Sequence, residues 1–178
     1  MKMNLETPPK PVHEPLKSIE AMAPASGMKR PRRMDDAIVR EAAGLLAVEC
    51  VKWDNTSSAD DWIESLVKVR HSWDDGYKFA RDLEQAAHVE PDADLVELLG
   101  DGYEILSTVH EREVRRWVQI VGFTPAHAVG DRVGCANGIG PIHEVRVATA
   151  QYVVDVKGTG NGGYVINAED IRPVEASN

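Results

Sequence analysis

Paired carboxylates are the side chains of this chain best suited to metal chemistry. Asp60-Asp61 and Asp74-Asp75 offer neighbouring oxygen ligands of the kind that Mg²⁺ takes. Adjacent residues on a helix point about 100° apart, so neither pair can close on one ion by itself. Both pairs also stand where helices are expected to begin, which explains them without a metal. We therefore predict no metal site. A metal-dependent hydrolase ranks third among the functional hypotheses, after binding of a protein and binding of nucleic acid.

Histidines and cysteines complete the candidates for catalysis. The motif HERE at 110–113 begins like a zinc-binding helix but lacks a second histidine four residues after the first. Cys50 and Cys135 lie far apart, without a CxxC motif or an arranged base, so we interpret both as buried thiols. No two histidines have metal-ligand spacing; they are His13, His71, His88, His110, His127 and His143. We predict a protein without catalytic residues and without a cofactor.

Two glycine-rich segments could cradle a phosphate or turn a strand. GCANGIG at 134–140 and GTGNGG at 158–163 are not followed by Lys-Ser/Thr and do not open a helix, as a phosphate loop would. Asn137-Gly138 lies between two β-prone runs, and this dipeptide is typical of a type I′ hairpin turn. Gly140 with the proline after it indicates a bulge or bend near a sheet edge. We therefore predict turns here.

The net charge of −9 is spread unevenly over the 178 residues. Residues 1–34 hold seven Lys or Arg against three Asp or Glu, residues 35–118 hold nine against twenty, and residues 119–178 hold four against six. Charges act over about 8–10 Å in physiological salt, so the local excess matters more than the total. The acidic middle is expected to repel nucleic acid.

The chain divides into three regions. Residues 1–34 contain six of the ten prolines and no sustained apolar period, which predicts a disordered basic arm. Residues 35–122 follow the helical period and predict an acidic domain of four helices. Residues 123–178 change to period-two alternation, which predicts strands. The expected fold class is α+β, and the lack of a long apolar run predicts a cytoplasmic protein.

Capping residues mark the expected helix starts. Asp35 is the expected N-cap of the first helix. SADD at 58–61 and SWDD at 72–75 are capping boxes for the next two helices, with Asp in place of the usual Glu. Pro91 fits the first turn of a fourth helix, which we expect to continue to the end of the domain. Gly-Asp-Gly at 100–102 is a weak point in it, and two helices meeting there are the alternative.

Four short motifs of the last region carry a resemblance to a known fold. Gly-Asp-x-Val at 130–133, a glycine-hinged strand at 138–142, Tyr-Val-Val at 152–154 and Glu-Asp-Ile-x-Pro at 169–173 follow one another. In this order they resemble the SH3-like barrels of the Tudor and KOW type, over residues 125–175. The resemblance implies a small closed β-barrel of a kind that binds proteins or nucleic acids.

The barrel is expected to dock on the helices. A barrel of about 50 residues is marginally stable by itself. Trp117, Val121 and Phe123 lie where the last helix would meet it. We therefore predict a core shared by the last helix and the barrel.

The function expected from the sequence is binding without catalysis, and the make-up of the chain resembles that of accessory proteins of phages and prophages. The first hypothesis is a protein partner with a basic surface, one version being inhibition of a host nucleic-acid-binding or defence complex. Its contacts would be Asp60, Glu64, Asp74, Asp82, Asp92 and Asp94. The second hypothesis is nucleic acid, bound through Lys29, Arg30, Arg32, Arg33, Arg132 and Arg146. No membrane contact is expected, and the oligomeric state is left open.

Overall fold

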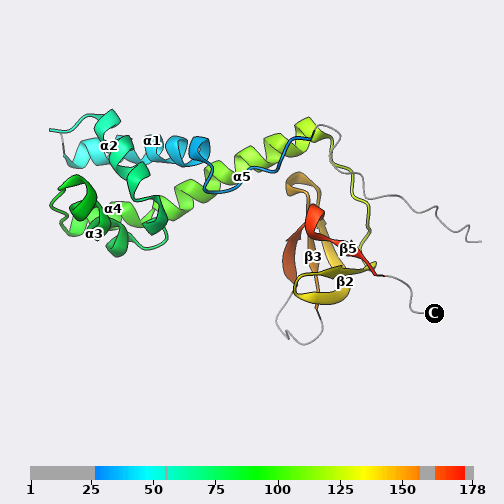
Figure 1. Cartoon of the computed structure of the whole chain (residues 1–178). Coiled ribbons are helices and arrows are strands. Elements are labelled where there is room, and N and C mark those ends of the chain that lie inside the picture. The colour runs from blue at the N-terminus through cyan, green and yellow to red at the C-terminus, as the bar shows by residue number, and fades with distance from the viewer. Residues whose placement is uncertain (1–26, 55, 157–162, 175–178) are drawn as a thin grey trace, which may run out of the picture.

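The computed structural model describes residues 27–54, 56–156 and 163–174 of the chain. The α-helices come first and the strands second, which confirms the predicted mixture of helix and sheet. Figure 1 shows the helices packed together at one end and the sheet near the far end of the longest helix, α5. The α-helices are α1 (Asp36–Trp53), α2 (Ala59–Lys68), α3 (Gly76–Ala87), α4 (Ala93–Gly100) and α5 (Gly102–Val121). The short 3₁₀ helices are η1 (Arg70–Ser72), η2 (Val147–Thr149) and η3 (Ala168–Asp170). The strands are β1 (Arg132–Cys135), β2 (Gly138–Arg146), β3 (Gln151–Val154), β4 (Tyr164–Asn167) and β5 (Arg172–Pro173).

One apolar core holds the helices α1–α5 together, and we refer to them as the helical part. Val39, Leu46 and Cys50 recur at helical spacing on α1 and are fully buried. Trp73 stacks on Phe79 with 5.3 Å between the ring centres. Helix α1 lies against α2 and α5, and α3 lies against α4. Burying each large apolar side chain stabilises the folded state by about 1.5–3 kcal/mol, so this core holds the first turns of α5 in place.

The two predicted capping boxes have different outcomes. Ser58 caps α2 as predicted, because its hydroxyl accepts from the Asp61 N–H and the Asp61 carboxylate accepts from the Ser58 N–H. The second predicted box is wrong, because Asp75 itself caps α3 and accepts from two backbone N–H groups of the first turn. Ser72 ends η1 instead, and its hydroxyl donates to Asp82.

The long helix predicted from Pro91 onward is wrong, and the alternative of two helices is correct. Helices α4 and α5 meet at Asp101. A Cβ on Gly102 would lie 3.1 Å from Cε1 of Phe79, so the glycine permits the start of α5 to pack closely on α3. Pro91 precedes α4 instead of lying in its first turn, and Asp92 is the N-cap. The helical part therefore has one α-helix more than the four predicted.

The five strands form an antiparallel sheet in the order β4-β3-β2-β1-β5. Tyr152 and Val154 are buried, as the alternation predicts, while Val153 between them is partly exposed. Within the described residues no ladder joins β4 to β5. The observed architecture is thus an open sheet, and the closed barrel stays a prediction.

The hairpin between β1 and β2 turns one residue earlier than predicted. Cys135 pairs with Gly138, so Ala136 and Asn137 are the two loop residues. Neither loop residue has a positive φ, which excludes the predicted type I′ turn; the left-handed φ of 133° belongs to Gly138. A Cβ on Gly138 would also lie only 2.6 Å from Cγ1 of Val156. The glycine is structural, as predicted, but it belongs to the strand.

Gly140 has a different role from the predicted bend at a sheet edge. Strand β2 lies between β1 and β3, and its register shift falls between Ile142 and Glu144. A Cβ on Gly140 would lie 1.7 Å from the backbone oxygen of Asp155. The Asp155 N–H donates to the carbonyl of Pro141 at 3.0 Å. Glycine is needed at 140 because the chain leaving β3 passes directly over it.

Helix α5 extends from the core of the helical part to the sheet. Its last turns pack Trp117 against Ala150, and Phe123 lies at the margin of this cluster. The Tyr152 hydroxyl accepts from the Ala126 N–H at 3.1 Å and so holds the connecting segment on the sheet. The predicted shared core is confirmed by these contacts.

Candidate functional site

Residues 28–33, which we name the strap, lie along α5 on the way to the first helix. Figure 1 shows this segment in dark blue beside α5. The Trp117 indole N–H donates to the carbonyl of Met28 at 3.0 Å, and Nε2 of His110 lies 3.1 Å from the carbonyl of Pro31. The predicted disorder of the arm is therefore wrong for the strap, because polar contacts fix it without an apolar face. The earlier residues of the arm lie outside the described part of the chain.

Arg30 binds the strap to the sheet. Its guanidinium donates to both carboxylate oxygens of Glu169, at 2.6 and 3.2 Å, and to the carbonyls of Thr149 and Ala150, at 2.9 and 2.7 Å. Its central carbon lies 5.0 Å from the centre of the Trp117 ring. The side chain is only 12% exposed. A bidentate, charge-assisted pair of this kind is a strong contact, so Arg30 clamps the strap in place.

A cleft of about 680 Å³ lies between the strap, α5 and the segment from β2 to β3. Five arginines line it against a single carboxylate, that of Glu111; they are Arg30, Arg32, Arg33, Arg115 and Arg146. The chain as a whole has a net charge of −9, so the cleft is a local reversal of sign. Concave surfaces lined by one sign of charge concentrate counter-ions. The cleft is suited to a polyanion.

Besides Arg30, which pairs with Glu169, two further cleft arginines have carboxylate partners at the surface. Arg115 pairs with Glu111 at 2.6 Å, one helical turn away. Arg146 pairs with Glu144 at 3.1 Å, and the hydrogen bonds that Arg146 donates to this carboxylate, followed by the carboxylate's charge, raise the pKa of Arg146 above its ordinary value. Exposed ion pairs contribute about 0–1 kcal/mol each, so an incoming phosphate can replace either carboxylate at little cost.

The uncompensated positive charge of the cleft comes from the strap. Arg32 is exposed, and its guanidinium has no acidic partner among the described residues. Arg33 lies over the ring of Tyr103, 4.9 Å from the ring centre, and likewise has no carboxylate partner in the described part of the chain. The strap therefore supplies the two cations that are most available to a ligand.

Polar uncharged side chains line the sheet side of the cleft. The Thr149 hydroxyl donates to Oε1 of Gln151 at 2.9 Å, and Nε2 of Gln151 donates to Oδ1 of Asn167 at 3.1 Å. Each amide has further donor or acceptor capacity. This wall can hydrogen-bond a sugar or a base edge beside a bound phosphate.

The cleft brings together four of the six predicted nucleic-acid contacts, Arg30, Arg32, Arg33 and Arg146. Lys29 and Arg132 are exposed but do not line it. Sequence reasoning misses Arg115, because it lies in a region whose total charge is strongly negative. The run HEREVRRW at 110–117 contains three arginines, and counting charge over that one segment would have found it.

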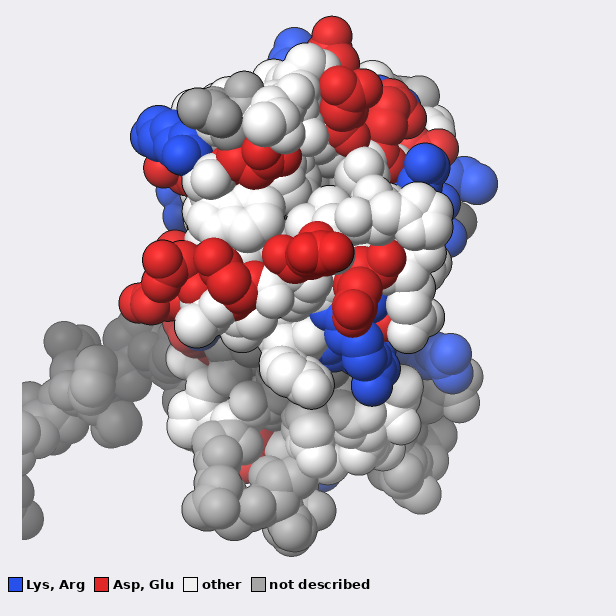
Figure 2. Space-filling model, turned by 90° about the vertical axis from the view of Figure 1, so that its left-hand side faces the viewer, with Lys and Arg blue, Asp and Glu red and all other residues white. Residues whose placement is uncertain are grey.

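The predicted acidic contacts lie on the helical part, and half of them have structural roles. Glu64 pairs with Arg40 at 2.6 Å. The Asp82 carboxylate accepts a hydrogen bond from the Ser72 hydroxyl, and Asp92 caps α4. Figure 2 shows carboxylates gathered over the end of the helical part that lies away from the sheet. Three of the predicted residues are exposed and make no ion pair within the described residues; they are Asp60, Asp74 and Asp94.

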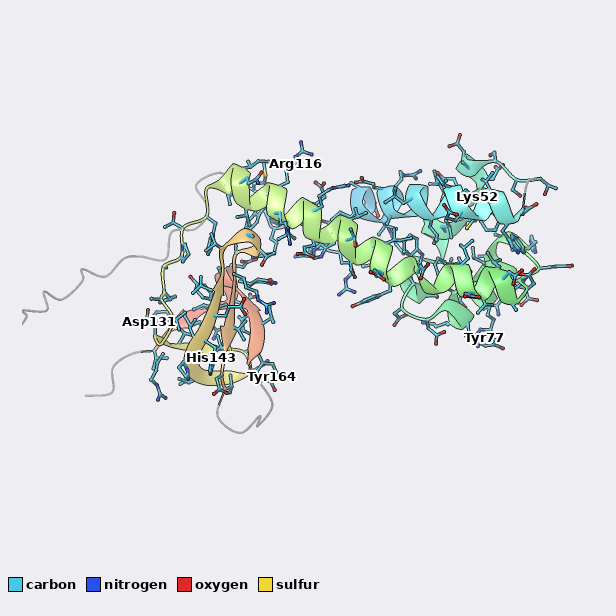
Figure 3. The ribbon with its side chains drawn as sticks, turned by 180° about the vertical axis from the view of Figure 1, so that it is seen from behind. Lys52, Tyr77, Arg116, Asp131, His143 and Tyr164 are labelled. Carbon is cyan, nitrogen blue, oxygen red and sulfur yellow. The ribbon has the colours of Figure 1, made fainter. Side chains whose placement is uncertain are left out.

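Other residues with candidate chemistry are dispersed over the molecule. In Figure 3, His143 and Tyr164 lie on the sheet, whereas Tyr77 lies at the far end of the helical part. Among the described residues, no three metal-ligating side chains come together, and no helix is long and apolar enough to span a bilayer. Cys50 is buried as predicted, and burial raises the pKa of its thiol to about 12. Cys135 is only half-buried, so the prediction is wrong there.

Comparisons of the chain with protein-family models, with curated proteins and with solved structures give no match. Function is therefore inferred from the cleft and the strap themselves.

Proposed function

We propose that this protein is a nucleic-acid-binding accessory protein without catalysis of its own, and that its cleft holds a phosphate backbone. The observation that carries the proposal is the convergence of five arginines from the strap, α5 and β2 on one concavity of an acidic chain. Guanidinium groups stay charged at physiological pH and bind phosphate oxygens in a bidentate manner. This proposal replaces a basic protein partner, the first hypothesis from the sequence, with the second.

The distribution of charge would orient the protein on a nucleic acid. Acidic side chains gather over the end of the helical part that lies away from the sheet (Figures 1 and 2). A polyanion is repelled from that end and attracted to the cleft. The acidic middle of the sequence is thus compatible with nucleic-acid binding, because the acidic end of the helical part and the basic cleft are separated along α5.

We also infer that the sheet is an SH3-like barrel of the kind that the sequence motifs resemble. The order β4-β3-β2-β1-β5, with β5 returning to β1 after η3, supports this inference. Barrels of this kind bind proteins or nucleic acids, and this likeness alone does not choose between them. The arginines of the cleft favour nucleic acid.

A protein partner with a basic surface is the second candidate, and the exposed carboxylates of Figure 2 favour it. Asp74 has no ion-pair partner in the described part of the chain. If this end binds a basic protein, Asp74→Lys should weaken binding more than Asp74→Asn does. Both effects should fade as salt rises, because screening shortens the range of the charges.

Binding of fluorescent oligonucleotide duplexes tests the proposed function. Loss of one phosphate contact changes affinity by about eightfold at ~0.1 M salt, from a slope of about 0.9 per contact. Arg32→Gln and Arg146→Gln should each produce a loss of that size for every duplex sequence. Arg132→Gln is the matched control, because Arg132 is exposed but lies outside the cleft.

Two results would contradict the proposal. One is an equal loss of affinity in the Arg132 and Arg32 variants, which would mean that an exposed arginine contributes to binding whether or not it lines the cleft. The other is displacement of the duplex by polyglutamate at matched charge concentration, which would indicate an acidic polypeptide as the ligand.

A further inference from the structure

We propose that Arg30 and Glu169 form a latch that positions the strap, so that the cleft is complete only while the strap is docked. This inference rests on the proposed function, because it concerns how the same cleft is assembled. Arg30 is a positioning residue in this scheme, and Arg32 and Arg33 are the side chains that it delivers to the ligand.

The strap and its immediate flank bury little apolar surface. Met28 is 45% exposed and Met34 is 43% exposed. Lys29 and Arg32 are also exposed. Segments with few buried apolar contacts open locally at low free-energy cost. Four of the hydrogen bonds that hold the strap belong to the Arg30 side chain, so docking depends on this residue.

The sheet presents a preformed set of acceptors to Arg30. Ala150 is fully buried and has a left-handed φ of 48°, which is uncommon for a residue other than glycine. The carbonyls of Thr149 and Ala150 both accept from Arg30. The Ala168 N–H donates to the same Ala150 carbonyl at 3.0 Å, which places Glu169 beside it. A backbone held in a sparsely populated conformation is typical of a functional site, and here it shapes a guanidinium pocket.

Docking of the strap and binding of nucleic acid are therefore coupled. The docked strap places Arg32 and Arg33 beside Arg115 and Arg146 in the cleft. A polyanion that contacts all four favours the docked state, and docking raises the affinity for the polyanion by the same factor. Removing a carboxylate near such a ligand ordinarily raises affinity. Removing Glu169 should have the opposite effect, because the strap is then released.

The experiment compares Glu169→Gln with Glu111→Gln. The two side chains are similarly exposed, at 43% and 52%, and each pairs with an arginine of the cleft. Duplex affinity and hydrogen exchange of the Trp117 indole N–H are measured for both variants and for the wild type. This N–H donates to the Met28 carbonyl of the strap, so we refer to its exchange as strap exchange. We expect Glu169→Gln to lower affinity at least threefold and to speed exchange of the strap about tenfold, the effect of losing one charge-assisted contact. Glu111→Gln should raise affinity and leave strap exchange unchanged.

The two readouts separate the latch from the proposed function. Higher affinity in Glu169→Gln, as in Glu111→Gln, would overturn the positioning role. Unchanged strap exchange in Glu169→Gln would overturn the latch, whatever the affinity. If the wild-type protein binds no oligonucleotide, the proposed function fails, while faster strap exchange in Glu169→Gln still supports the latch.

Discussion

Gly140→Ala is expected to destabilise the sheet strongly. The new Cβ would lie 1.7 Å from the Asp155 carbonyl oxygen, where real contacts do not fall below 3.0 Å, so the chain leaving β3 must move by more than 1 Å. That movement breaks the 3.0 Å hydrogen bond from the Asp155 N–H to Pro141 and displaces the buried Val156. We estimate about 1 kcal/mol for the hydrogen bond and about 1–3 kcal/mol for overpacking. The total of about 2–4 kcal/mol corresponds to about 4–16 °C in melting temperature.

Gly134→Ala is the matched control on the neighbouring strand. The atom nearest to a Cβ on Gly134 is the Arg172 carbonyl oxygen at 3.6 Å, an ordinary contact. The substitution should leave stability unchanged or raise it by about 0.4–1 kcal/mol, because it restricts the unfolded chain. Thermal and urea unfolding followed by circular dichroism measure both variants. A Gly140→Ala variant that melts with the wild type, or a Gly134→Ala variant that loses as much, would refute the close approach over β2.

Three further predictions concern stability and accessibility. Residues 125–178 expressed alone should melt at lower temperature and less cooperatively than the full chain, because the cover from α5 is lost; equal melting would exclude a shared core. The hydrogen bonds from the Ser58 side chain and backbone hold the pKa of Asp61 below its ordinary 3.8. These bonds therefore stabilise the folded state above pH 3.8, and this stabilisation is lost as the pH falls through the lowered pKa. Ser58→Ala should therefore be less stable than the wild type at neutral pH, with the difference narrowing in acid urea titrations. Iodoacetamide should modify Cys135 in the native protein and Cys50 only with denaturant; simultaneous modification would contradict the burial of Cys50.

Local sequence patterns predict the helices and strands well, because each pattern acts over a few residues. The capping box at Ser58 and the alternation through Tyr152 and Val154 are recognisable without tertiary information. The prediction is wrong by one residue at Asn137-Gly138, because a local pattern does not contain the tertiary contacts. The dipeptide signals a hairpin, but the packing of Val156 decides which residue has the positive φ.

The strap could not be predicted, because its contacts are distant in sequence and polar. Arg30 and Glu169 are 139 positions apart. A composition argument weighs apolar burial against ordering entropy, and by that measure residues 28–33 should remain disordered. The four hydrogen bonds that the Arg30 guanidinium donates, together with its contact with the face of the Trp117 ring, fix the segment instead. The cleft was hidden for the same reason, since its arginines come from three separate segments.

The salt dependence of duplex binding tests most directly whether the cleft holds a phosphate backbone. Four arginines of the cleft are available to phosphates, namely Arg32, Arg33, Arg115 and Arg146. With about 0.9 counter-ions released per contact, the logarithm of the binding constant should fall with the logarithm of salt at a slope of about −3.6, and Arg32→Gln should reduce this slope by about 0.9. A slope near zero, or a slope that Arg32→Gln leaves unchanged, would contradict phosphate binding in the cleft.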